Sequence, residues 1–206
     1  MSRISVVIPT YNRPEMLKEA VESILAQTLP PCEVLIGDDS PDAAGRSIIE
    51  ALQSKTAIPL RYFHNTPSLK QAANVGALIE KAEGELLSLL HDDDWFLPTA
   101  LEDLHSCFEK HSSIVAAYGK QQLANHDGVV DPQGTVELNR TYRRTEKEEG
   151  AQPDAVAAAV TQQFPNDAWL VKTSLAKAVG YTELGKTYNN AVDFAFGVKL
   201  AQQSKG

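Results

Sequence analysis

Short apolar stretches alternate with segments of helical period along the first half of the chain. The apolar stretches predict buried strands, because they are brief and end at Gly, Pro or acidic residues; they lie at 4–8, 34–36, 60–64 and 86–90. The segments between them place apolar residues three or four positions apart, which indicates amphipathic helices; they lie at 14–25, 44–55, 69–82 and 98–110. This alternation predicts an α/β fold, with a single mostly parallel sheet flanked by helices.

The pattern is looser beyond Ile114. The stretch 114–122 predicts a strand, and the turn at 125–128 makes 129–138 a candidate hairpin partner for it. The polar stretch 139–153 carries both signs of charge and predicts a solvated loop. The remaining expected elements are a short strand at 169–171 and helices at 173–179 and 192–202. We therefore expect a small antiparallel part in the C-terminal half.

Length and charge narrow the class of protein. The chain has 206 residues, which suits one domain with a sizeable core. Its formal charge of -8 argues against nucleic acid or anionic membranes as partners, since both are negatively charged. No apolar run approaches the roughly 20 residues of a membrane span, and we expect no secretory signal before the strand at Ile4. Cys32 and Cys107 form no disulfide framework. We predict a cytoplasmic protein, with peripheral membrane association left open.

An acidic block follows the fourth predicted strand. The residues are His91, Asp92, Asp93 and Asp94, so three carboxylates stand in succession at a strand end. In open α/β sheets, ligands bind at the carboxyl ends of strands. The three carboxylates repel one another, and Mg²⁺ or Mn²⁺ shared with a phosphate group is the natural partner for them. A solvated turn or a helix cap is the plainer alternative for such a loop.

Two common phosphate-binding loops are missing from the chain. It contains neither GxGxxG after the first strand nor GxxxxGK[ST], so a glycine loop does not hold a nucleotide here. Acids instead follow two strands that should be neighbours, at Asp38-Asp39 and at the acidic block. Carboxylates at these places suit sugar hydroxyls, base N–H groups and a cation that neutralises a diphosphate.

Taken together, these residues resemble the inverting family 2 glycosyltransferases of the GT-A fold. The resemblance runs in order through most of the chain, at Val6–Arg13, Glu33–Ser40, Ala82–Glu85, the acidic block, Ala178–Tyr181 and Val192–Phe194. It implies a Rossmann-like sheet in one catalytic domain, 1–206. About 1–98 would bind the nucleotide sugar and about 99–206 would serve the acceptor, with truncation at the C-terminus left open.

The resemblance also implies roles for individual residues. Those near the nucleotide would be Pro9, Thr10, Tyr11, Asn12, Arg13, Asp39, Lys70 and Asp92. Asp39 would accept a hydrogen bond from the base, and Asp92 would face the ribose. Asp93 would hold the divalent metal, Mn²⁺ or Mg²⁺, in the DxD element. Asp193 would be the general base that takes a proton from an acceptor hydroxyl, either of a glycan or of another molecule. UDP is the preferred nucleotide.

Several of these residues have simpler structural roles open to them. Asp39 and Asp42 suit the cap of the following helix, and Asp193 suits the first turn of its own helix. Lys70 at a helix start is commonly solvated, and Asn12 suits a turn before Pro14. Tyr11 also suits a cover over the sheet edge, His91 a packed neighbour of the acids, and Trp95 a lid or core aromatic.

Comparison with the family pattern shows one further agreement and three departures. Asn74 stands where relatives often carry an Asn. His91 stands where relatives often have an acid, Val192 where many have Glu, and Thr66 where Gly is common.

Two different functions stay open. One is a non-catalytic nucleotide-sugar-binding domain of a larger protein, which a turnover assay would distinguish from an enzyme. The second is a sugar-1-phosphate nucleotidyltransferase, which normally carries a Gly-rich loop with a basic residue after the first strand. The residues from Ile8 to Asn12 contain no such loop.

Overall fold

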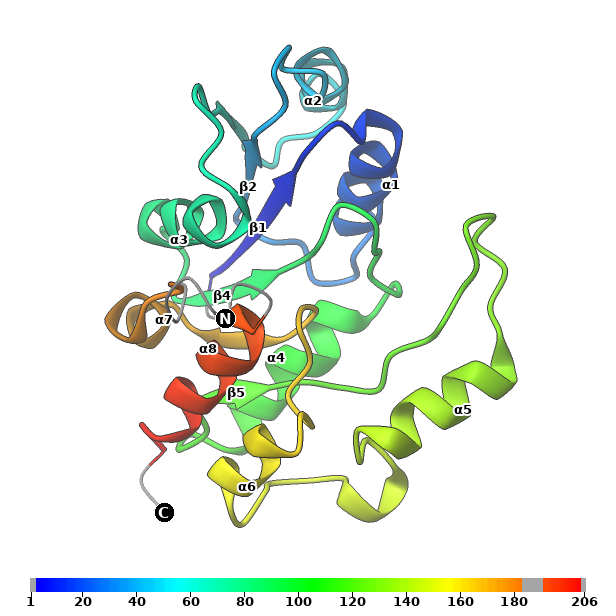
Figure 1. Cartoon of the computed structure of the whole chain (residues 1–206), viewed down its shortest axis with the longest axis vertical. Helices are drawn as coiled ribbons and strands as arrows, with labels where there is room; N and C mark the ends of the chain where they lie inside the picture. Colours follow the sequence, from blue (N-terminus) through cyan, green and yellow to red (C-terminus); the bar gives the residue numbers. More distant parts are fainter. Residues whose placement is uncertain (1–2, 183–190, 205–206) are drawn as a thin grey trace.

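The computed structural model describes residues 3–182 and 191–204. Within these residues, six strands form one sheet in the order β3-β2-β1-β4-β6-β5 (Figure 1). The strands are β1 (Ile4–Thr10), β2 (Glu33–Asp38), β3 (Leu60–His64), β4 (Leu86–Leu89), β5 (Ala116–Ala117) and β6 (Leu170–Lys172). The first four run parallel, whereas β6 lies antiparallel to both β4 and β5. This confirms the predicted mostly parallel α/β sheet with an antiparallel C-terminal part.

Helices cover both faces of the sheet, because successive strand residues point to opposite sides. Val6 and Ile8 face one core with α1 (Pro14–Leu25), α2 (Arg46–Gln53) and α4 (Ala100–Lys110). Val7 faces the other core, which α3 (Gln71–Lys81), α7 (Thr173–Val179) and α8 (Val192–Ala201) complete. Burial on both faces explains why β1, β2 and β4 are mostly apolar, whereas β3, the outermost of the parallel strands, is only partly buried.

The predicted strand at 114–122 is much shorter in the structure, and the predicted hairpin partner at 129–138 is wrong. Strand pairing at 114–122 is confined to Ala116–Ala117, and one isolated bridge joins Ala124 to Val130. Helix α5 (Pro132–Thr141) occupies most of the predicted partner strand. The Asp131 side chain accepts from the Gly134 N–H, and Pro132 occupies the first turn of α5. This capping signal decides the local structure in favour of a helix.

Two short helices also interrupt the C-terminal half. The 3₁₀ helix η1 (Glu146–Glu148) lies within the stretch predicted as a loop. Helix α6 (Ala155–Val160) begins after Asp154, whose side chain accepts from the Ala157 N–H. The expected strand near 169–171 is β6, and α7 ends at Gly180 with a φ of 68°, a conformation that suits glycine. None of the helices in 3–182 and 191–204 combines the length and apolarity needed to cross a bilayer.

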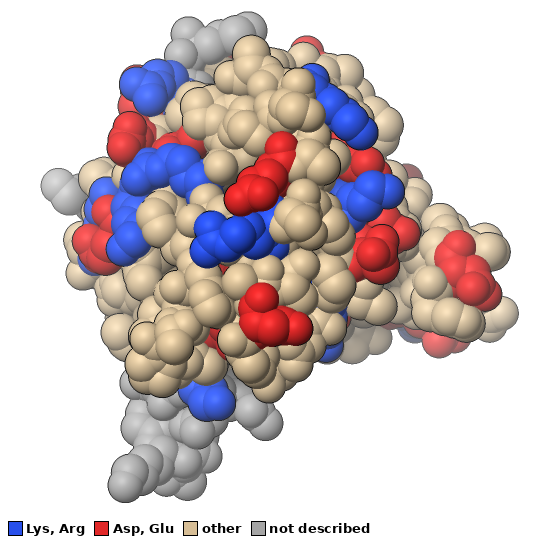
Figure 2. All heavy atoms as spheres, turned by 90° about the horizontal axis from the view of Figure 1, so that it is seen from above, with Lys and Arg blue, Asp and Glu red and all other residues tan. Residues whose placement is uncertain are grey.

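Helix α5 and the loop before it project from the rest of the fold. Figure 1 shows this arm at the lower right, and Figure 2 shows it again as a protrusion. Lys and Arg are interspersed with Asp and Glu on the face shown in Figure 2, so that face carries no continuous patch of one sign.

Candidate functional site at the carboxyl edge of the sheet

The carboxyl ends of β1 and β4 bring four of the predicted residues together. Thr10 Oγ1 donates to Asp92 Oδ2 at 2.7 Å. Arg13 Nη1 lies 3.2 Å from Asp92 Oδ1 and 2.6 Å from Asp93 Oδ2. Asp92 is only 6% exposed, whereas Asp93 is exposed. One guanidinium therefore joins a buried and an exposed carboxylate at the point where β1 and β4 end.

The acids at this edge have fewer positive partners than negative charges. Burial raises the pKa of Asp92, and the neighbouring Asp93 raises it further, against the opposing effects of Thr10 and Arg13. The two carboxylates raise the pKa of Arg13, which therefore stays charged. One guanidinium offsets only part of the repulsion among Asp92, Asp93 and Asp94. The arrangement thus favours an additional cation.

His91, Asp93 and Asp94 form a group that could hold that cation. One ligand atom from each residue lies within 4.8 Å of the others. Among the residues that the structure describes, no partner is found for the buried His91 Nε2 atom. Carboxylate oxygens suit Mg²⁺ and Mn²⁺, and an imidazole nitrogen suits transition metals better than Mg²⁺. The donor set therefore fits a divalent metal, with Mn²⁺ the better match if His91 takes part.

Asp39 holds the loop that precedes α3. Its carboxylate is 6% exposed, and it accepts from Asn65 Nδ2 at 2.8 Å, from Ser68 Oγ at 3.1 Å and from the Leu69 N–H at 3.2 Å. It does not cap α2, which begins after Gly45 without a side-chain cap. The neighbouring Asp38 instead accepts from the N–H of Gly45, the residue that precedes α2, at 3.2 Å.

A second asparagine completes the connection between β2 and α3. Asn74 Nδ2 donates to the Gly37 carbonyl at 2.7 Å, and Asn74 Oδ1 accepts from Asn65 Nδ2 at 3.1 Å. A Cβ atom at Gly37 would lie 2.0 Å from Asn74 Oδ1, so any side chain there would displace the asparagine. The family resemblance pointed to Asn74, but nothing in the sequence pattern indicated these contacts.

The remaining residues predicted near the nucleotide line the same edge. Pro9 is buried within β1 opposite Gly37, and Tyr11 is 53% exposed. Asn12 has a φ of 53°, and its N–H donates to Ser40 Oγ at 2.8 Å. Lys70 is exposed at the start of α3. Hydrogen bonds connect five of the predicted residues at this edge of the sheet: Thr10, Asn12, Arg13, Asp39 and Asp92. The hydrogen bonds of Lys70 involve only its backbone.

Asp193 lies in the first turn of α8 and belongs to a separate set of hydrogen bonds. The Tyr181 hydroxyl donates to Asp193 Oδ1, and Tyr181 is buried. Burial raises the pKa of Tyr181, and the Asp193 carboxylate raises it further, so the phenol keeps its proton as a donor. In the described part of the chain, no hydrogen bond joins Asp193 to the acidic block.

A family model described as Glycosyl transferase family 2 matches residues 5–162. The chain belongs to this family. The match covers every residue predicted near the nucleotide and metal, and it ends before Asp193. Among curated members, a GalNAc(5)-diNAcBac-PP-undecaprenol beta-1,3-glucosyltransferase of Campylobacter jejuni is 34% identical over 106 residues, which are 50% of this chain and 34% of that protein. The glycosyltransferase GlyG of Streptococcus pneumoniae is 32% identical over 126 residues, 61% of this chain and 41% of GlyG.

Solved structures of two other proteins show the same fold. TarS 1-349 of S. aureus matches with a TM-score of 0.68 at 20% identity, over 96% of this chain and 55% of that one. It was also solved with UDP and with UDP-GlcNAc. The mannosyltransferase PcManGT from Pyrobaculum calidifontis, in complex with GDP-Man and Mn²⁺, matches with a TM-score of 0.66 at 15% identity, over 93% of this chain and 50% of that one. The family 2 chain thus spans about half the length of these proteins or less.

Sequence reasoning missed Asp167, which is fully buried beside the acidic block of this family 2 chain. Its Oδ2 atom accepts from the His91 N–H at 3.0 Å, and its Oδ1 atom accepts from Gln121 Nε2 at 3.3 Å. The available signal was weak, since it consisted of two polar residues, Asn166 and Asp167, just before a predicted strand. Only the packing of the C-terminal half against β4 shows their proximity to the acids.

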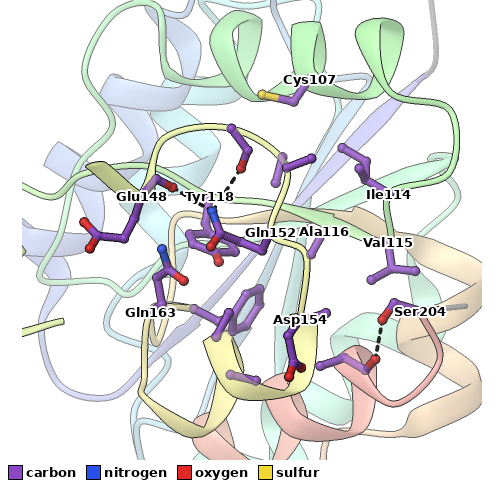
Figure 3. A pocket seen from close by; sticks show the side chains of 18 of the residues that line it. Cys107, Ile114, Val115, Ala116, Tyr118, Glu148, Gln152, Asp154, Gln163 and Ser204 are labelled. Carbon is purple, nitrogen blue, oxygen red and sulfur yellow. Dashed lines mark hydrogen bonds between the residues drawn. The ribbon is translucent and has the colours of Figure 1, made fainter. Parts of the chain in front are cut away.

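A separate groove of about 1220 Å³ lies along β5, between the end of α4 and helices α6 and α8 (Figure 3). Tyr118, Gln152 and Gln163 are among the residues that line it. Gln152 Nε2 donates to the Glu148 carbonyl at 2.6 Å, which holds part of the groove wall in place. None of the predicted site residues lines this groove, so it is distinct from the carboxyl edge.

Proposed function

We propose that this family 2 chain is an inverting glycosyltransferase that moves a sugar from a nucleotide-diphosphate donor to an acceptor hydroxyl. The observation that carries the proposal is the meeting of Thr10, Arg13, Asp92 and Asp93 where β1 and β4 end. A UDP-sugar is the preferred donor, which is supported by the fold shared with TarS, a protein solved with UDP and UDP-GlcNAc. Synthesis of a polysaccharide or surface glycan is the proposed setting, and a cytoplasmic location stays a prediction.

The nucleotide would lie over the carboxyl ends of β1 and β2. Asp92 is aligned by Thr10 and Arg13 and would accept from ribose hydroxyls. Asp39 would receive the base, together with Pro9, Tyr11, Asn12 and Lys70 around it. We propose that about 1–98 carries this donor-binding role and that about 99–206 serves the acceptor.

Asp93 would hold a divalent cation, with His91 and Asp94 as further ligands. When bound, Mn²⁺ or Mg²⁺ would supply charge neutralisation for the departing nucleoside diphosphate. Mn²⁺ is supported by its presence in the PcManGT structure and by the imidazole beside the two carboxylates. Arg13 contributes a fixed positive charge at the same edge, because it contacts both Asp92 and Asp93.

Asp193 would act as the general base. The acceptor oxygen forms its bond to the anomeric carbon while the bond from that carbon to the diphosphate oxygen breaks, and the hydroxyl proton passes to Asp193. Because the attack comes from the side opposite the leaving group, one displacement inverts the configuration. The Tyr181 hydroxyl holds one carboxylate oxygen and leaves the other available for the acceptor proton.

Calorimetric titration with a panel of UDP- and dTDP-sugars, with and without Mn²⁺, tests the proposal. We expect one donor to bind in the presence of Mn²⁺ and binding to fall about 10–100-fold or more in Asp93→Ala, because even the loss of an outer-shell partner of a metal costs that much. Asp127→Ala is the matched control, since Asp127 is an exposed acid on the projecting arm. Binding that is indifferent to Mn²⁺ and to Asp93 would refute the metal role. Donor binding without turnover for any acceptor would instead identify a non-catalytic binding domain.

A further inference from the structure

Asp167 is a fully buried carboxylate that the proposed mechanism does not use. It lies in the connection between α6 and β6, far along the chain from the acidic block. Its Oδ2 atom nevertheless accepts from the backbone N–H of His91, the residue that begins that block, at 3.0 Å. Because a buried carboxylate is costly unless it is well partnered, its position beside the block requires an explanation.

The contact that Asp167 makes with the acidic block is to its first residue. Its Oδ2 atom accepts from the N–H of His91, which stands two positions before Asp93, and Asp167 is fully buried. Asp167 therefore fixes the backbone at the start of the block without reaching solvent itself.

The surrounding packing leaves Asp167 little freedom to move. The Ala168 N–H donates to the Leu89 carbonyl at 2.8 Å, which ties the segment to the end of β4. Trp169 is fully buried and its ring stacks on Phe164, with the ring centroids 5.7 Å apart. The adjacent Asn166 adds a contact of 3.4 Å from its Nδ2 atom to His91 Nδ1. The carboxylate is thus presented from a rigid frame.

A chain of hydrogen bonds links Asp167 to other residues of the C-terminal half. Gln121 Nε2 donates to Asp167 Oδ1 at 3.3 Å, and Arg144 Nη1 donates to Gln121 Oε1 at 2.5 Å. Arg144 Nε then donates to the Gln163 carbonyl at 2.9 Å. Arg144 and Gln163 also line the groove shown in Figure 3. The acidic block is therefore joined to the acceptor-side half through Asp167.

We infer that Asp167 is a positioning residue, which fixes the loop from His91 to Asp94 in the arrangement that binds a divalent cation and the donor diphosphate. The inference rests on the proposed function. Outer-shell partners of metal ligands orient those ligands, and their loss typically weakens metal binding about 10–100-fold. Asp167 meets that description, because it holds the backbone of His91, which is itself one of the proposed ligands.

Titration of Mn²⁺ in the presence of UDP, followed by the electron paramagnetic resonance signal of free Mn²⁺, tests the inference. In Asp167→Ala we expect the Kd for Mn²⁺ to rise about 10–100-fold and the His91 amide to exchange its hydrogen faster. Asp167→Asn keeps an oxygen that can accept from His91, so we expect protection to persist and the Kd to rise less, by about threefold to tenfold. If Asp167→Ala does not fold, an unchanged Kd in Asp167→Asn overturns the inference.

Glu33→Gln is the matched control, since Glu33 is a buried carboxylate at the opposite edge of the sheet. It should lower the melting temperature and leave the Kd for Mn²⁺ unchanged. An equal loss of Mn²⁺ affinity in Glu33→Gln and Asp167→Ala would reveal general destabilisation and overturn the inference. If the wild type binds Mn²⁺ and Asp167→Ala binds it with the same Kd, the inference is overturned and the proposed metal role is unaffected. Failure of the wild type to bind Mn²⁺ overturns the proposed metal role, and the inference fails with it.

Discussion

The two edges of the sheet bury carboxylates in different ways. At the amino edge, Glu33 is 4% exposed. Its oxygens accept from Ser5 Oγ at 2.6 Å, from the Glu83 N–H at 2.7 Å and from Arg61 Nη1 at 2.7 Å. At the carboxyl edge, Asp92 is 6% exposed and also has partners on both oxygens, but it adjoins two further acids. The two carboxylates are thus similarly buried, but Glu33 has a complete set of partners and Asp92 lies in an excess of negative charge.

The pKa values of the two carboxyl groups move in opposite directions. Burial alone would raise the pKa of Glu33, but the hydrogen bonds from Ser5, Glu83 and Arg61 outweigh it and leave that pKa below its usual range. Burial raises the pKa of Asp92, and its partners do not compensate because Asp93 adds repulsion. A buried acid with a full set of donors stabilises a fold, whereas acids short of positive charge suit a site that receives a cation from outside.

The largest expected effect is at Asp193, the proposed general base for a donor bound at the carboxyl edge. Asp193→Asn should lower kcat for sugar transfer about 10²–10⁴-fold, because the general base is lost, while the Kd of the donor stays the same. Initial rates and donor titrations measure the two quantities separately. Tyr181→Phe is the comparison variant, since it removes the hydrogen bond and keeps the carboxylate; we expect a smaller loss of kcat. Retention of near wild-type kcat in Asp193→Asn would exclude Asp193 as the base.

The amino edge should show the reverse pattern. Glu33→Gln leaves Arg61 without its buried partner and weakens three hydrogen bonds, so we expect the free energy of unfolding to fall by about 1–3 kcal/mol. The donor Kd and kcat should not change. Urea denaturation measures the stability, and donor titration of the folded variant provides the control. A change in donor affinity with no loss of stability would break the contrast between the edges.

The acid dependence of stability sharpens the same comparison. Because the pKa of Glu33 is lowered in the folded state, its stabilising contribution is fully present above the unfolded value of about 4.3 and is lost as the pH falls through the folded value. The stability difference between wild type and Glu33→Gln should therefore shrink below about pH 4. Urea unfolding between pH 3 and pH 7 measures it. A difference that grows with acidity would have the wrong sign for this account.

The smallest effect is expected at Lys70, an exposed residue at the donor edge. Lys70→Ala should weaken donor binding less than about threefold, because exposed charges contribute little. Calorimetry in low and high salt measures the change, with Lys110→Ala, on α4, as the control. A tenfold or greater loss confined to Lys70→Ala would show that this side chain moves onto the bound nucleotide.

Sequence alone was sufficient for β1, β2 and β4 because both faces of each strand are buried. Their apolar runs left little room for another interpretation, and parallel strands necessarily bring Asp39 and Asp92 to one edge. The interpretation failed at 129–138, where the turn at 125–128 suggested a hairpin partner although the valines at positions 129, 130 and 136 are exposed. Helix α6 escaped notice because AVAAAV has no polar face to give a period.

Only the site residues that directly follow a strand could be placed from the sequence. Thr10, Arg13 and Asp92 follow from the ends of β1 and β4, and the structure brings them into contact. The contact of Asp167 with His91 depends instead on tertiary packing around Trp169, and the Tyr181–Asp193 pair depends on how α7 and α8 pack. No local spacing encodes either contact. The roles of these residues in binding and catalysis stay predictions.

The direction of β6 has a consequence for how this fold can diversify. Because β6 runs antiparallel to β4, the chain enters it at the carboxyl edge, so the residues just before β6 arrive beside the acidic block. A parallel strand in the same place would deliver them to the opposite edge. Substitutions and insertions between α6 and β6 should therefore act directly on the acidic block, while the four parallel strands keep their register. The geometry of that block can then evolve through a single connection.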